Sequence, residues 1–121
     1  MAKKLFAFLG IGDYKVVEYY FTNNLEEGYK TEYIQEALAK LLNVQGLSVT
    51  AFVTKEARKK HWEPEGNIGL KGKLERLSIS CKAVDISDGK TNDDIWGIFT
   101  KVYDEIEFGD EIYVDITHSL R

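Results

Sequence analysis

Cysteine, proline and histidine are scarce in this 121-residue chain, which contains one cysteine, one proline and two histidines. A single cysteine, Cys81, excludes an internal disulfide and is typical of a reducing cytoplasm. One cysteine and two histidines also provide no ligand spacing for zinc. We therefore expect a cytoplasmic protein with no metal site and no cofactor of its own.

Long apolar runs are absent as well. No stretch approaches the roughly 20 apolar residues that a membrane-spanning helix needs. Residues 1–10 combine a basic tip with an apolar segment, but that segment is short, lacks a small-x-small cleavage site and ends in a glycine turn. This pattern favours a buried strand over a signal peptide. The sequence therefore predicts no association with a membrane.

An excess of positive charge is missing too, since 16 basic and 20 acidic residues give a net charge of −4. Proteins that coat duplex nucleic acid carry a broad basic face, so this class is disfavoured. A small anionic ligand in a local pocket remains open, because only the local field matters there. With 44% apolar and 30% charged residues, the composition fits one folded domain spanning residues 1–121.

Apolar runs alternate along the chain with segments of helical periodicity. The runs predict strands at residues 5–9, 16–21, 47–53, 79–86 and 111–116. Helices are predicted to begin after three threonine caps, namely Thr31, Thr54 and Thr91. Residues 63–72 hold the only proline and are predicted to be a loop, with a weak helical turn at 74–77.

The last helix has an apolar face that we expect to pack against the sheet, with Trp96 packing there too. That face consists of Ile95, Phe99, Val102, Tyr103 and Ile106. Alternation of strands and helices predicts an α/β fold, a Rossmann-like, mostly parallel open sheet with helices on both faces. The chain stops shortly after Ile116, where such a fold places another helix. We therefore expect a fragment of a longer protein that lacks its C-terminal elements.

Two polar tips follow predicted strands, where open α/β sheets bind ligands. The first tip offers glycines for close backbone approach, a carboxylate, a phenol and a cation: Gly10, Gly12, Asp13, Tyr14 and Lys15. It is not a dinucleotide fingerprint, because the third glycine is missing and a strand is predicted to follow. A tight turn without a ligand is the alternative interpretation.

The second tip gathers two hydroxyls, an imidazole and a guanidinium: Thr117, His118, Ser119 and Arg121. The backbone N–H groups of a following helix would point at an anion here. A helix cap beside a surface arginine is the alternative. We predict that the two tips form one ligand site.

Three segments carry a resemblance to a known family. Residues 10–15 with 18–21, then 85–91, then 115–121 with its Asp-Ile-Thr-His motif, resemble the CRISPR-associated Csx/Csm family, in its Asp-x-Thr-His branch. The resemblance implies an N-terminal CARF domain, the Rossmann-like sensor of type III CRISPR antiviral defence. Such domains form homodimers and bind a cyclic oligoadenylate, commonly the tetra-adenylate, and a HEPN domain downstream cleaves RNA.

Ribonuclease activity cannot be assigned to these residues, because Arg58 and His61 are closer together than in a HEPN site. We interpret residues 58–61 as a solvated charged face, and Asp85 with Asp88 as a turn beside Gly89 rather than a cation site. The leading hypothesis is a cyclic oligoadenylate sensor. The alternatives are a ring nuclease that cleaves the same ligand, with His118 as acid or base, and a domain with structural duties alone.

Overall fold

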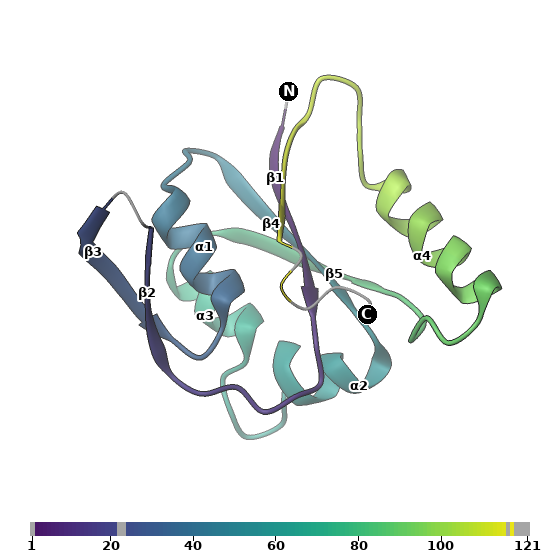
Figure 1. The fold of residues 1–121 in the computed structure, drawn as a ribbon, viewed down its shortest axis with the longest axis horizontal. Helices are drawn as coiled ribbons and strands as arrows, with labels where there is room; N and C mark the ends of the chain where they lie inside the picture. The colour runs from purple at the N-terminus through teal and green to yellow at the C-terminus, as the bar shows by residue number, and fades with distance from the viewer. Residues whose placement is uncertain (1, 22–23, 116, 118–121) are drawn as a thin grey trace.

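The computed structural model describes residues 2–21, 24–115 and 117. Four parallel strands form the central sheet in the order β5-β4-β1-β6, flanked by helices (Figure 1). The prediction of an α/β, Rossmann-like open sheet is therefore confirmed. The strands are β1 (Lys3–Leu9), β4 (Leu47–Val53), β5 (Ser80–Asp85) and β6 (Glu111–Asp115).

Both faces of β1 are covered, which explains its continuous apolar sequence. Leu5 and Leu9 point to one face of the sheet, and Phe6 points to the other; all three are buried. Leu5 pairs with Val49 on β4 and with Tyr113 on β6. The register thus places apolar side chains side by side across the centre of the sheet.

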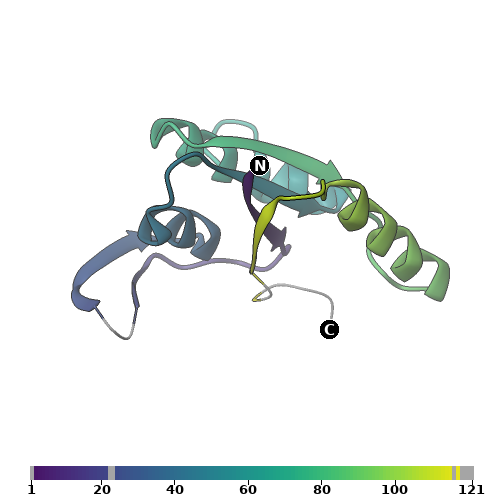
Figure 2. The same ribbon diagram turned by 90° about the horizontal axis from the view of Figure 1, so that it is seen from above.

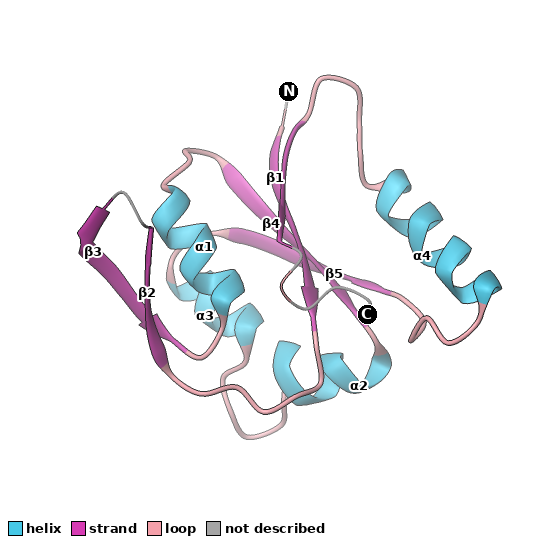
Figure 3. Cartoon of the chain, in the orientation of Figure 1, coloured by secondary structure: helices cyan, strands magenta, loops and turns pink. Residues whose placement is uncertain are grey.

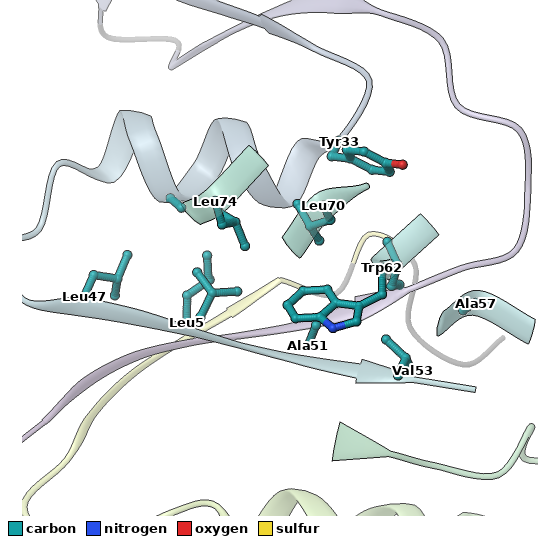
Figure 4. Close-up of a cluster of buried hydrophobic side chains, with 12 residues drawn as sticks. Leu5, Tyr33, Leu47, Ala51, Val53, Ala57, Trp62, Leu70 and Leu74 are labelled. Carbon is teal, nitrogen blue, oxygen red and sulfur yellow. The ribbon is translucent and has the colours of Figure 1, made fainter. Parts of the chain in front are cut away.

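The first face of the sheet packs against α1 (Ile34–Leu42) and α3 (Leu70–Arg76). Trp62 lies between this face and the helices, close to Leu70 and Ala51 (Figure 4). A fully buried side chain of this kind stabilises a fold by about 1.5–3 kcal/mol, so this cluster holds the domain together. Its members are Leu5, Leu9, Tyr33, Ala39, Leu47, Val49, Ala51, Val53, Ala57, Trp62, Leu70 and Leu74.

The second face carries an aromatic cluster and lies toward α4 (Asn92–Asp104), on the opposite side from α1 and α3 (Figures 2 and 3). Phe52 contacts Phe6 and Phe8, with ring centroids 5.4 and 5.3 Å apart. Ile98 is the buried residue of α4. The Thr91 hydroxyl accepts the Asp94 N–H at the start of this helix, so the predicted cap is confirmed.

The predicted packing face of α4 is wrong. Trp96, Phe99 and Tyr103 are exposed, Trp96 by 70% and Tyr103 by 76%, and Ile95 and Ile106 are exposed too. The reason is the rotation of the helix, which turns the stripe containing Ile98 inward. Trp96, Phe99 and Tyr103, which are spaced at i, i+3 and i+7, form another stripe of the helix, and this stripe consequently faces away from the sheet.

A separate antiparallel hairpin consists of β2 (Val17–Phe21) and β3 (Asn24–Thr31). The predicted strand at 16–21 therefore pairs with β3, which was not predicted, rather than with the central sheet. The predicted Thr31 cap is wrong, because Tyr33 occupies the cap position of α1. Thr31 instead ends β3, where its hydroxyl accepts the Tyr33 N–H and donates to Glu36.

The helix predicted after Thr54 is α2 (Lys55–Ala57), and the Thr54 cap is confirmed by its bond from the Ala57 N–H. It continues as a π-helical turn, η1 (Arg58–Trp62). The loop predicted at 63–72 is too long, since α3 begins at Leu70. Within the part of the chain that the structure describes, no helix is long and apolar enough to cross a membrane.

Candidate functional site

The strand order reverses between β1 and β6, which fixes where a ligand site is expected. From β1 the chain builds the sheet through β4 to β5 on one side, and it then returns to β6 on the other side. In open α/β sheets, ligands bind outside the carboxyl ends of the strands at such a reversal. Both predicted tips leave from these two neighbouring strands, where Ala7 pairs with Asp115. The structure therefore brings the starts of both tips to one edge.

A cavity of about 540 Å³ opens beyond the carboxyl ends of β1, β4 and β5, beside this reversal, and its size is within the range of small-molecule sites. Apolar side chains of the sheet and of the segment after β5 line it: Phe8, Leu9, Phe52 and Ile86. Polar residues of the adjoining loops complete the lining, together with Gly10 and Ile11: Thr54, Lys55, Glu56, Ser87, Asp88 and Lys90. Glu56 and Asp88 balance the charges of Lys55 and Lys90, so this lining suits a ligand with a flat apolar part and with groups that can accept hydrogen bonds from the lysines.

Two lysines supply the positive charge of the cavity. The Lys90 Nζ lies 3.3 Å from the Asp88 Oδ2, and both side chains are exposed. Exposed pairs of this kind stabilise a fold little, so Lys90 can exchange its carboxylate partner for a ligand phosphate. Lys55 follows the Thr54 cap and also lines the cavity.

The first predicted tip divides between the cavity and η1. Gly10 lines the cavity. Gly12 and Asp13 instead contact η1, through the Gly12 carbonyl and the Asp13 carboxylate. The Tyr14 hydroxyl donates to the Gly10 carbonyl at 2.9 Å, which closes the turn. Lys15 is exposed beside this turn.

The second predicted tip is described at Thr117 only. The Thr117 N–H and hydroxyl both donate to the Asp115 Oδ1, at 2.9 and 2.6 Å. The predicted site residues His118, Ser119 and Arg121 lie outside the described residues. Their part in the site therefore stays a prediction.

Two buried acceptors lie near the carboxyl ends of β1 and β6. Gln35 is completely buried, and its Nε2 donates to the Phe8 carbonyl at 3.1 Å. Within residues 2–21, 24–115 and 117, its Oε1 has no hydrogen-bond partner, and neither has the Oδ2 of Asp115, which is 5% exposed. A buried polar atom without a partner costs about 1–3 kcal/mol, so this edge of the sheet is not optimised for stability alone.

Burial also keeps the phenol at this edge protonated. Burial and, to a smaller extent, the nearby Asp115 carboxylate raise the pKa of Tyr14 to about 12, against the lowering effect of its hydrogen bond to the Gly10 carbonyl. Tyr14 therefore remains a neutral hydrogen-bond donor at any physiological pH.

Sequence reasoning missed most of the residues that line the cavity. Thr54 was recognised as a cap, and Asp88 as part of a turn beside Gly89, which indeed has a positive φ of 76°. Neither the cap nor the turn indicated that the segments containing Thr54 and Asp88 line the same cavity, because this depends on β4 and β5 being neighbours in the sheet. Residues 58–61 were interpreted as a solvated face, which is wrong for His61, because only 8% of it is exposed.

Comparison of the sequence with protein-family models and with curated proteins finds no significant match. Among the described residues, no group of three or more His, Cys, Asp or Glu side chains comes together in a way that could hold a metal ion. The function is therefore inferred from the cavity and the residues around it.

Proposed function

We propose that this chain is a CARF-type sensor domain of type III CRISPR antiviral defence, which binds a cyclic oligoadenylate as a homodimer. Cyclic tetra-adenylate is the proposed ligand, and its binding would regulate a ribonuclease domain downstream. The observation that carries this proposal is the cavity beyond the carboxyl ends of β1, β4 and β5, beside the reversal of strand order, where an aromatic side chain, lysines and hydroxyls come together.

Each part of an adenylate has a matching group at this edge. Adenine is flat and apolar on its faces, as is the partly exposed side chain of Phe8, whereas Phe52 lies buried behind it. Phosphate oxygens would accept hydrogen bonds from Lys55 and Lys90. A hydroxyl both donates and accepts, so Ser87 suits a ribose. Lys15, Thr117, His118, Ser119 and Arg121 would contact the phosphates and riboses from the two tips.

The exposed aromatic stripe of α4 supports the homodimer. Trp96, Phe99 and Tyr103 share one exposed face, and the Trp96 and Phe99 rings lie 5.9 Å apart. Aromatic side chains bury about 150–250 Å² each, so three of them supply much of the roughly 800 Å² per partner of a standard interface. Exposed apolar patches of this kind mark interaction sites.

A second copy of this chain is the proposed partner for this stripe, because of where α4 lies relative to the cavity. Residues 86–90, which line the cavity in part, lead directly into α4. Such a dimer would thus put two cavities beside one twofold axis, as a cyclic ligand requires.

Titration calorimetry with cyclic tetra-adenylate tests the ligand. We expect binding by the wild type and at least about tenfold weaker binding by Lys90→Glu, because the change repels phosphate. Lys40→Glu, at an exposed position on α1, is the matched control and should bind as the wild type does. Absence of heat with every cyclic oligoadenylate would reject the proposal. Chromatography of the same mixtures would detect linear di-adenylate, the product expected of a ring nuclease.

Sedimentation of the Trp96→Ser variant tests the dimer. We expect the wild type to sediment as a dimer at micromolar concentration and the variant as a monomer. Leu25→Ser is the control, since Leu25 is an equally exposed apolar residue on the separate hairpin. A wild-type monomer, or loss of the dimer in both variants, would contradict the assignment of α4.

A further inference from the structure

The π-helical turn η1 is the least regular helical segment of the domain, and it lies against the first tip. After Ala57 the hydrogen bonding widens, so that the Glu63 N–H donates to the Arg58 carbonyl at 3.0 Å. Turns of this type are rare, and many occur at functional sites. In an α-helix, consecutive side chains point in directions about 100° apart. In η1, by contrast, the consecutive side chains of Lys60 and His61 both reach the loop after β1.

Lys60 and His61 together hold three consecutive residues of that loop. The Lys60 Nζ donates to the Ile11 carbonyl at 2.8 Å and forms an ion pair with Asp13 at 3.0 Å. The Nε2 of His61 lies 2.7 Å from the Gly12 carbonyl. One short turn of the chain thus fixes the path of the tip beyond β1.

Buried aromatic residues fix the orientation of His61 in turn. Its Nδ1 lies 3.2 Å from the Tyr33 hydroxyl, and its ring stacks on Tyr14 with centroids 4.4 Å apart. Because the Gly12 carbonyl can only accept, Nε2 carries the hydrogen, and Nδ1 accepts from Tyr33. Tyr33, at the start of α1, therefore donates to His61, and His61 in turn donates to the Gly12 carbonyl of the loop.

The Tyr14 side chain anchors the end of this loop through its hydrogen bond to the Gly10 carbonyl and its packing against the core. Residues 11–13 form the rest of the loop. It contains no regular secondary structure, and Ile11 and Asp13 are both exposed. A Cβ atom added at Gly12 would meet nothing within 4 Å, so packing around Gly12 does not restrain the loop either. Since Gly10 and Ile11 line the cavity, the position of this loop sets one wall of the site.

We infer that Lys60 and His61 are positioning residues, which hold the loop at residues 10–14 in the conformation that receives the ligand. This inference rests on the proposed function, in that the ligand is the proposed cyclic oligoadenylate. Preorganised loops bind more tightly, because the ordering cost does not fall on the binding step. The Lys60–Asp13 pair is exposed and adds little to folding, so its loss should change binding far more than stability.

Three variants separate positioning by Lys60 from a general effect of charge or stability. For Lys60→Met we expect about tenfold weaker binding of cyclic tetra-adenylate, with an unchanged unfolding midpoint. Lys60→Arg keeps the charge and the donors and should restore most of the affinity. Lys59→Met removes a neighbouring exposed lysine and should bind as the wild type does. Equal affinity of Lys60→Met and wild type would overturn the role of Lys60.

Two variants test His61 in the same way. His61→Phe keeps an aromatic ring beside Tyr14 but removes the donor to Gly12, so we expect weaker binding. His61→Gln offers an amide N–H to Gly12 and an oxygen to Tyr33, and it should recover affinity. If His61→Gln binds cyclic tetra-adenylate no more tightly than His61→Phe does, the hydrogen bond from residue 61 to the Gly12 carbonyl does not position the loop.

A measurement without ligand keeps this inference distinct from the proposed function. Order parameters from ¹⁵N relaxation should fall at residues 11–14 in Lys60→Met, from about 0.85 toward 0.6, and remain high in Lys59→Met. If the wild type binds no cyclic oligoadenylate, the proposed function fails. Positioning of the loop is then decided by relaxation alone, and unchanged order parameters would overturn it.

Discussion

Replacing Gly69 with alanine should destabilise the domain strongly, although glycine is not required there for its backbone conformation. Gly69 caps α3 with φ −92° and ψ −166°, an extended conformation that any residue adopts. The constraint is close packing. A Cβ atom at this position would lie 2.3 Å from the His61 carbonyl oxygen, 2.6 Å from that of Trp62 and 2.5 Å from the Pro64 Cδ.

These distances set the size of the effect. Atoms at van der Waals contact lie about 3.5 Å apart, so η1 and α3 must separate by about 1 Å to admit one methyl group. All three opposing atoms belong to backbone or to a proline ring, and none can rotate aside. Overpacking typically costs about 1–3 kcal/mol, and we expect the upper end. For a domain of this length, that corresponds to a midpoint lower by about 10 °C.

Thermal and urea unfolding followed by circular dichroism provide the assay. Gly12→Ala is the matched control, because its new Cβ would meet no atom within 4 Å, and its stability should stay within about 0.5 kcal/mol of the wild type. A Gly69→Ala protein as stable as the wild type would refute the packing argument. Equal losses in both variants would show that flexibility of glycine, rather than the contact with η1, determines the effect.

Three further changes test other parts of the fold. Gly97→Ala, in the exposed interior of α4 with no atom within 4 Å of the new Cβ, should raise the free energy of unfolding by up to about 1 kcal/mol. Phe52→Ala should lower it by about 3–5 kcal/mol, whereas Phe108→Ala should leave it nearly unchanged, because Phe108 is fully exposed. The Lys4 ammonium holds the pKa of Asp110 below its usual range. The stability from this pair is therefore present at neutral pH and lost as the pH falls through that lowered pKa. Asp110→Asn should accordingly be less stable at pH 7 and lose less stability on acidification to about pH 3, as measured by urea unfolding at both values.

The central sheet could be predicted because its strands are nearly continuous apolar runs. Burial on both faces produces such runs, and β1 and β4 are the clearest examples. β3 was missed because its sequence, NLEEGYKT, is polar. Its pairing with β2 and its contact with α1 hold it in place, and neither leaves an apolar run in the sequence.

The orientation of α4 could not be predicted from its own sequence. The helix has apolar residues on more than one side, so periodicity alone does not say which stripe meets the sheet. Ile98 is buried and Trp96 is exposed. The position of a helix over a sheet depends on its connecting loops, and the loop before α4 turns at Gly89, with positive φ. The exposed aromatic stripe of α4 is therefore the basis for the proposed dimer interface.

In the candidate site, too, features that depend on neighbouring residues could be predicted, whereas contacts between distant segments could not. The position of the first tip could be predicted because it follows β1 directly, and that relation is local. The residues that hold the first tip in place, Lys60 and His61, were not predicted, because their role depends on a contact between segments that are distant in the sequence. His61 reaches Gly12 only from a π-helical turn, and that turn packs its carbonyl groups against Gly69. A methyl group at Gly69 should thus weaken ligand binding as well as folding, because η1 cannot move away from α3 without moving His61 relative to the loop.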